Sequence, residues 1–86
     1  MKLKKEFIVH NTGREAMLVP TASAEFYGVV KGNEVLGDIL SLLGREISEE
    51  ELVQAMAAQY DAPVDALARD VRKALIELRK IGALEE

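Results

Sequence analysis

The sequence predicts an α+β fold, with three antiparallel strands in its first third followed by three helices. Two observations carry this prediction. Apolar residues alternate with a period of two up to Val30, and after Asn33 they recur at spacings of three and four. Strand patterns that precede helix patterns, rather than alternating with them, are typical of α+β domains. The length of 86 residues suits one modest core, so we expect residues 1–86 to form a single domain.

The first two strands are expected to form a hairpin. In Glu6–Asn11, apolar Phe7 and Val9 alternate with residues that face the other way, which is the pattern of a half-buried strand. Turn-forming residues follow directly, and the second strand is expected at Glu15–Val19. Strands joined by so short a turn are antiparallel neighbours.

The third strand is expected at Phe26–Val30, where aromatic and β-branched residues gather without any charge. The sequence leaves two arrangements open for it. It is either an edge strand with unpaired backbone groups, or a strand in the centre of the sheet or beneath a helix. The first arrangement would make it a candidate binding surface.

The first helix is expected to begin after the capping residue Asn33. Its apolar residues run to Leu43, and Gly44 is expected to end it in the left-handed conformation. A glycine inside a helix costs about 1 kcal/mol relative to alanine. We therefore interpret Gly37 as allowing the close approach of a neighbouring segment, and the alternative is a glycine that is merely tolerated.

The second helix carries the clearest start signal, because Ser48 and Glu51 have the spacing of a capping box. Pro63 is expected at the first position of the third helix, which Gly82 ends. One broad apolar face of that helix predicts its burial. Its members are Val64, Leu67, Ala68, Val71, Ala74, Leu75, Leu78 and Ile81.

Composition excludes several classes of function. The net charge of −4, with the acidic excess in the second half, argues against nucleic-acid binding by bulk attraction. The absence of cysteine excludes disulfides and thiolate metal sites and fits a reducing cytoplasm. No apolar run approaches the roughly 20 residues of a membrane span, and no signal sequence is evident, so we expect a cytoplasmic protein without membrane partners.

Residues able to perform catalysis are scarce. His10 is the sole histidine, and neither a zinc motif nor a phosphate-binding glycine loop is present. Catalysis requires a base with partners that the sequence does not supply. We expect a protein that is not an enzyme and that holds no metal or cofactor.

A second candidate surface lies on the outward face of the third helix. At about 100° per residue, Ile76 points away from the apolar face. The basic residues around it are Arg69, Arg72, Lys73 and Lys80. The sequence leaves open whether this face is simply solvated, receives an acidic amphipathic peptide, or touches phosphates.

Four features of residues 26–86 occur together in one known family. A strand ends in a small residue and Asn before an apolar helix (29–43), and the turn Gly-x-x-Ile-Ser-x-Glu-Glu follows (44–51). The next helix closes in Gln-Tyr-Asp-x-Pro (59–63). The end combines Asp70, Val71, Leu75, Leu78, Gly82 and Leu84. By these features the chain resembles the PqqD-like proteins, named for pyrroloquinoline-quinone synthesis protein D and known as RiPP recognition elements.

This resemblance implies a winged-helix-like fold and a non-catalytic adaptor. Such a protein binds the leader of a ribosomally made precursor peptide and presents it to a modifying enzyme, often of the radical-SAM type, in peptide or PQQ-like cofactor maturation. The leader would add as a strand to the third strand, beside the third helix. The residues predicted to contact it are Phe26, Tyr27, Gly28, Val29, Val30, Lys31, Arg69, Arg72, Lys73 and Ile76.

The main alternative is a winged-helix transcription regulator with one helix in the DNA major groove. Against it stand the net charge of −4 and strands that precede the helices. A bare dimerisation domain is a third possibility, and the sequence leaves open whether the protein is a monomer or a homodimer.

Overall fold

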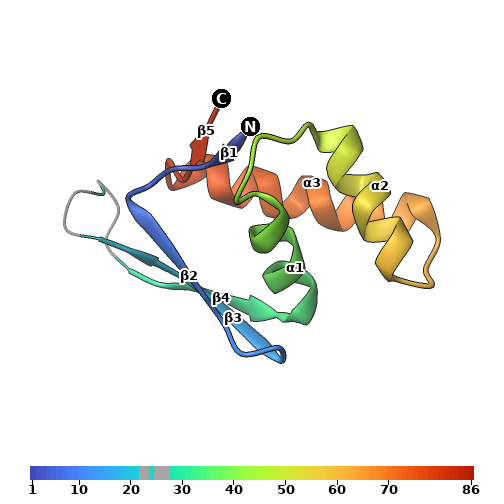
Figure 1. The fold of residues 1–86 in the computed structure, drawn as a ribbon, viewed down its shortest axis with the longest axis horizontal. Helices are drawn as coiled ribbons and strands as arrows, with labels where there is room; N and C mark the ends of the chain where they lie inside the picture. Colours follow the sequence, from blue (N-terminus) through green and yellow to red (C-terminus); the bar gives the residue numbers. More distant parts are fainter. Residues whose placement is uncertain (22–23, 25–27) are drawn as a thin grey trace.

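The computed structural model describes residues 1–21, 24 and 28–86. A three-stranded antiparallel sheet packs against a layer of three helices (Figure 1). The α+β class and the predicted order, a three-stranded antiparallel sheet followed by three helices, are confirmed, and two short strands near the chain ends form a separate pair. The elements are β1 (Lys2–Leu3), β2 (Phe7–Asn11), β3 (Glu15–Pro20), β4 (Val30–Asn33), α1 (Glu34–Leu42), α2 (Glu49–Gln59), α3 (Val64–Lys80) and β5 (Leu84–Glu85).

The predicted hairpin is present as β2 and β3, and its alternation separates the two faces of the sheet. Phe7, Ala16 and Leu18 are buried toward the helices. Ile8 pairs with Val19 on the opposite face, where the Ile8 residue is 56% exposed. The period of two therefore reports which face the helices cover.

The third strand begins later than predicted. β4 starts at Val30, the last residue of the predicted strand, and runs to Asn33, so the expected Gly-Asn step does end the strand. Of the predicted strand, Phe26 and Tyr27 lie outside the described residues, and Gly28 and Val29 lie outside β4. Two causes act here.

The first cause is Gly28, whose φ of 130° departs from strand geometry. The second is pairing with β3, which aligns Lys31 with Met17 and Gly32 with Ala16. This tertiary pairing overrides local strand propensity.

The predicted starts of the first two helices are confirmed. The Asn33 side chain accepts hydrogen bonds from the backbone N–H groups of Val35 and Leu36, at 3.1 and 3.3 Å. The Ser48 and Glu51 side chains bond each other's backbone N–H groups, at 3.1 and 3.0 Å. Capping thus places the first residue of α1 directly after β4.

Two predicted helix boundaries are wrong. Gly44 does not have a positive φ, because α1 ends in a tight turn in which the Gly44 N–H donates to the Ser41 carbonyl at 3.2 Å. Pro63 precedes α3 as its N-cap residue and is not its first helical residue. Gly82, with a φ of 71°, does end α3 as predicted.

The core lies between the sheet and the helices, and α3 contributes Leu67, Val71, Leu75 and Leu78 to it. Gly37 brings α1 close to the sheet. A Cβ atom at Gly37 would lie 3.2 Å from the Cβ of Ala16 and 2.7 Å from the Asn11 amide nitrogen. The predicted close approach at Gly37 is confirmed.

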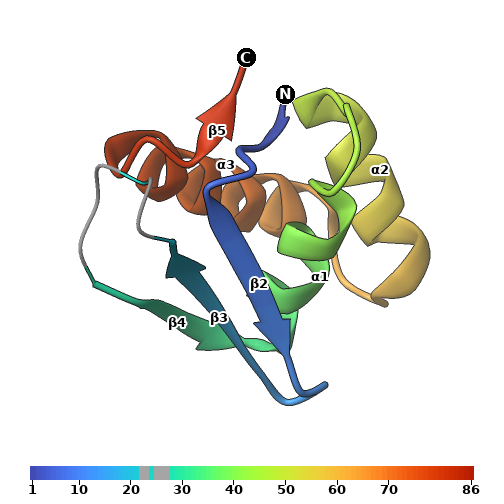
Figure 2. The same cartoon turned by 60° about the vertical axis from the view of Figure 1, so that its left-hand side comes forward.

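The sequence did not predict the pairing of β1 with β5, which places the two ends of the chain side by side (Figure 2). Leu3 aligns with Leu84, and the Leu3 N–H also donates to the Leu43 carbonyl at 2.9 Å. The first residues therefore join the α1–α2 connection to the end of α3. None of the helices described is long and apolar enough to cross a bilayer.

Candidate functional site

Strand β4 forms one edge of the sheet. The strand order is β2-β3-β4, and within the described ranges β4 pairs only with β3. The arrangement that the sequence left open is thus the edge arrangement. One side of β4 retains backbone N–H and C=O groups that can pair with another extended chain.

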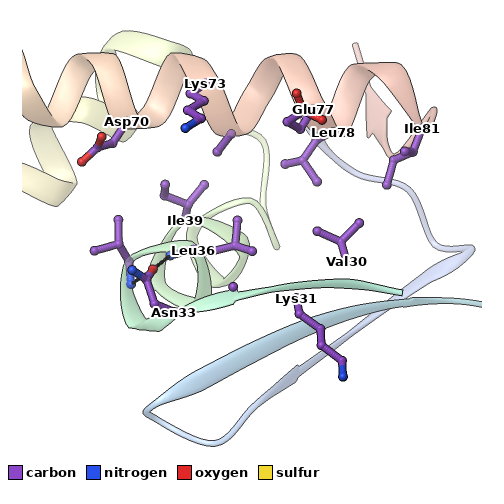
Figure 3. Close-up of a pocket in the computed structure, with 13 residues that line it drawn as sticks. Val30, Lys31, Asn33, Leu36, Ile39, Asp70, Lys73, Glu77, Leu78 and Ile81 are labelled. Atoms are coloured by element: carbon purple, nitrogen blue, oxygen red, sulfur yellow. Dashed lines mark hydrogen bonds between the residues drawn. The ribbon is translucent and has the colours of Figure 1, made fainter. Parts of the chain in front are cut away.

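A groove of about 520 Å³ runs along β4, between this strand, α1 and α3 (Figure 3). Its apolar lining comes from all three elements. These residues are Val30, Val35, Leu36, Ile39, Ala74, Leu78 and Ile81. The polar lining consists of Lys31, Asn33, Asp70, Lys73 and Glu77.

Gly32 permits the close contact between β4 and α1 at the base of the groove. A Cβ atom at Gly32 would lie 2.8 Å from the Cβ of Leu36 and closer still to its Cδ2. Real Cβ atoms do not approach this closely, so only glycine allows Leu36 to lie over the strand. The absence of one side chain therefore fixes the position of another in the groove.

The groove changes character along its length. In Figure 3, Asn33, Asp70 and Lys73 lie toward one end, while Val30 and Ile81 lie toward the other. One end thus presents polar groups and the other presents aliphatic side chains. An occupant would experience different chemistry at its two ends.

The charges on the α3 wall partly offset one another. Glu77 accepts a hydrogen bond from Lys80 at 3.4 Å. Among the described residues, Asp70 and Lys73 form no ion pair within 4.0 Å, although Lys73 lies between Asp70 and Glu77 along the helix. The α3 wall therefore carries no large excess of positive or negative charge.

A hydrogen bond connects α1, one wall of the groove, to the end of α2. The Tyr60 hydroxyl, at the end of α2, donates to the Asp38 carboxylate on α1. This bond, with partial burial, raises the pKa of Tyr60 to about 12. α1 is therefore tied to α2 through two residues that do not line the groove.

The groove brings together only part of the predicted contact set. Val30, Lys31 and Lys73 line it. Gly28 and Val29 are exposed just before β4, and Phe26 and Tyr27 are outside the described residues.

The predicted residues on the outward face of α3 do not line the groove. Arg69, Arg72 and Ile76 are exposed, and the Ile76 residue is 44% exposed. Arg72 Nε lies 3.5 Å from a carboxylate oxygen of Glu49 on α2. Peptide contacts by Arg69, Arg72 and Ile76 therefore stay a prediction. These three residues lie outside the groove.

Sequence reasoning missed most of the groove. On α3 the lining residues occur at positions 70, 73, 74, 77, 78 and 81, which is one helical stripe beside the buried face. This spacing was visible in the sequence. The contribution of α1 was not, because it depends on how α1 folds back over β4.

The groove and the free edge of β4 lie side by side and together form a candidate binding surface. Among the described residues, no group of three or more His, Cys, Asp or Glu side chains could hold a metal ion. A free strand edge beside an apolar groove is suited to receive an extended chain.

Comparison with solved structures shows the same fold elsewhere. The chain is similar to the solved structure "TbiB1 in Complex with the TbiA(beta) Leader Peptide", with a TM-score of 0.75 and 24% sequence identity. The match covers 99% of this chain and 100% of the other. At this identity the likeness concerns the fold. A comparison with curated proteins gave no match.

A family model described as "Coenzyme PQQ synthesis protein D (PqqD)" matches residues 15–84, which include β3, β4 and all three helices. The matched segment contains every residue that lines the groove. The resemblance drawn from the sequence is confirmed, and the chain belongs to the PqqD family.

Proposed function

We propose that this protein is a non-catalytic adaptor that binds the leader segment of a ribosomally made precursor peptide. The leader adds as a fourth strand to the open edge of β4 and lies in the groove against α1 and α3. The observation that carries the proposal is the coincidence of this unpaired edge with an apolar groove of about 520 Å³.

Both parts of the site are needed for useful affinity. A backbone hydrogen bond contributes only about 0.5–1.5 kcal/mol net, and β4 has four residues. The groove adds burial of apolar side chains, at about 25 cal/mol per Å² removed from water. Main-chain bonding therefore sets the register of the peptide, and the groove supplies affinity and selectivity.

Two comparisons support this function. The chain belongs to the PqqD family, and the solved structure that shares its fold is that of TbiB1 in complex with a leader peptide. The proposal extends that mode of binding to the groove of this chain. It rests on the geometry at β4, since the sequence identity alone is low.

The adaptor acts by bringing its peptide to a second protein. We propose a peptide-modifying enzyme, such as a radical-SAM protein, as this partner, in the cytoplasm where the precursor is made. With the leader held on β4, the remainder of the precursor is free to enter the enzyme.

NMR titration tests the binding mode. The isotope-labelled protein is titrated with the leader of a precursor peptide encoded beside its gene. We expect amide shifts at Lys31 and Gly32 and at Ala74 and Leu78, and slower amide hydrogen exchange in β4. Ile8 on the opposite edge serves as an internal control. Tight binding without shifts at β4 would contradict strand addition.

A further inference from the structure

Lys31 is among the residues that line the groove, but its side chain points out of the groove (Figure 3). It lies in the middle of β4, aligned with Met17 of β3. Figure 3 shows its side chain leaving β4 on the side away from α3, while Val30 points toward α3. A strand added to β4 would therefore meet Lys31 on the outer face of the sheet and Val30 on the groove face.

Strand geometry fixes which peptide residues meet these groups. Residues directly opposite each other in neighbouring strands share a face, and successive residues alternate between faces. The peptide residue opposite Lys31 therefore lies on the outer face. Its two neighbours, opposite Val30 and Gly32, point into the groove.

The groove face favours apolar neighbours over charged ones. The peptide residue opposite Val30 faces the aliphatic end of the groove, near Leu78 and Ile81. The residue opposite Gly32 faces Leu36, which covers that glycine. A carboxylate placed here would lie near Asp70 and Glu77 as well as near Lys73, so the α3 wall offers it little net attraction.

The outer face differs, because the charge of Lys31 is not neutralised. Lys31 is exposed, and no ion pair or hydrogen bond engages its side chain among the described residues. Glu15 is its diagonal neighbour through Met17, but the two side chains form no ion pair within 4.0 Å. An opposite charge directly across an added strand would stabilise the pairing.

We infer that the site selects an extended peptide segment of the form apolar–acidic–apolar, and this inference rests on the proposed function. The acidic residue lies opposite Lys31, and its apolar neighbours fill the groove beside Val30 and over Leu36. The acidic residue also fixes the alignment of the peptide with β4. A shift of the peptide by one residue would move its carboxylate from the outer face into the groove.

The test selects binders from a displayed library of random peptides, using the native protein, Lys31→Glu and Lys31→Gln. The native protein should enrich an acidic residue between two apolar residues. Lys31→Glu should enrich a basic residue at the same position, and Lys31→Gln should show no charge preference. Circular dichroism confirms the folding of each variant, which is expected because Lys31 is exposed.

Synthetic peptides then measure the effect. Peptides with a central Val-Glu-Val should bind the native protein about three- to tenfold more tightly than those with Val-Lys-Val, and Lys31→Glu should reverse the order. Peptides that bind at β4 with the same charge preference on all three proteins would overturn this inference and leave the proposed function intact. Failure to select any peptide that binds at β4 would overturn both.

Discussion

Helix α3 presents two faces outside the core, and they differ in what lies opposite them. The groove face lies opposite α1 and β4 and includes Lys73, Ala74 and Glu77. The outward face, which includes the exposed residues Arg72 and Ile76, does not line this groove. Each face combines aliphatic and charged residues. The residues of a helix face therefore do not define a binding site until a second element encloses them.

The largest expected effect comes from filling the groove. Ala74→Phe places an aromatic ring between α3 and β4, and we expect peptide affinity to fall by about 100-fold or more, since steric exclusion removes the groove contacts. Isothermal titration calorimetry with the leader peptide measures this change. Ile76→Phe is the matched control, because it adds the same ring two residues away on the outward face. Equal losses in both variants would remove the functional distinction between the two faces.

A smaller effect is expected from Gly32→Ala. The new Cβ atom would overlap Leu36, lying 2.8 Å from its Cβ, and would displace this groove-lining side chain. We expect a loss of about 1–3 kcal/mol in unfolding free energy, measured with urea, and a clear fall in peptide affinity.

The double variant Gly32→Ala, Leu36→Ala removes the overlap with the Cγ and Cδ2 atoms of Leu36 and leaves only the approach to its Cβ, so it should recover part of the stability lost in the single variant. If the losses in unfolding free energy of the two single variants simply add in the double variant, the contact between positions 32 and 36 does not account for the effect of Gly32→Ala.

The hydrogen bond between Tyr60 and Asp38 should make the stability of the fold depend on pH. The bond to Asp38 raises the pKa of Tyr60 to about 12 in the folded state, against about 10 in the unfolded chain. Its contribution to stability is therefore fully present below pH 10 and is lost as the pH rises from 10 to 12. Phenolate absorbance should show one tyrosine that titrates near 12, and this signal should vanish in Tyr60→Phe. A titration of Tyr60 near 10 would contradict this hydrogen bond.

The smallest effect is expected on the outward face. Arg72 contacts Glu49 at 3.5 Å, but both side chains are exposed, and such pairs contribute about 0–1 kcal/mol. We expect the double variant Arg69→Gln, Arg72→Gln to change peptide affinity by less than about twofold. A larger loss would support the contact set predicted from the sequence. Duplex DNA binding by the native protein at low salt would instead favour the regulator alternative.

Local signals in the sequence were sufficient for most of the elements. The alternation around Phe7, the cap at Asn33 and the box formed by Ser48 and Glu51 all depend on neighbouring residues, and the structure shows each of them. The third strand was misplaced because its limits depend on pairing with Met17 and its neighbours. The pairing of β1 with β5 joins opposite ends of the chain, so no local pattern indicates it.

The candidate site was predicted in outline and not in detail. The use of one strand edge and of α3 followed from the family resemblance, and Val30, Lys31 and Lys73 do line the groove. The part played by Leu36 could not be predicted, because it requires knowledge that α1 turns back over Gly32.

The pairing of β1 with β5 has a practical consequence for how this protein can be attached to others. Both ends of the chain meet above α3, whereas β4 lies below it (Figure 1). The unit could be spliced into a surface loop of a larger polypeptide, or its ends could be joined and new ends opened elsewhere. In either case the guest peptide would still have an unobstructed approach.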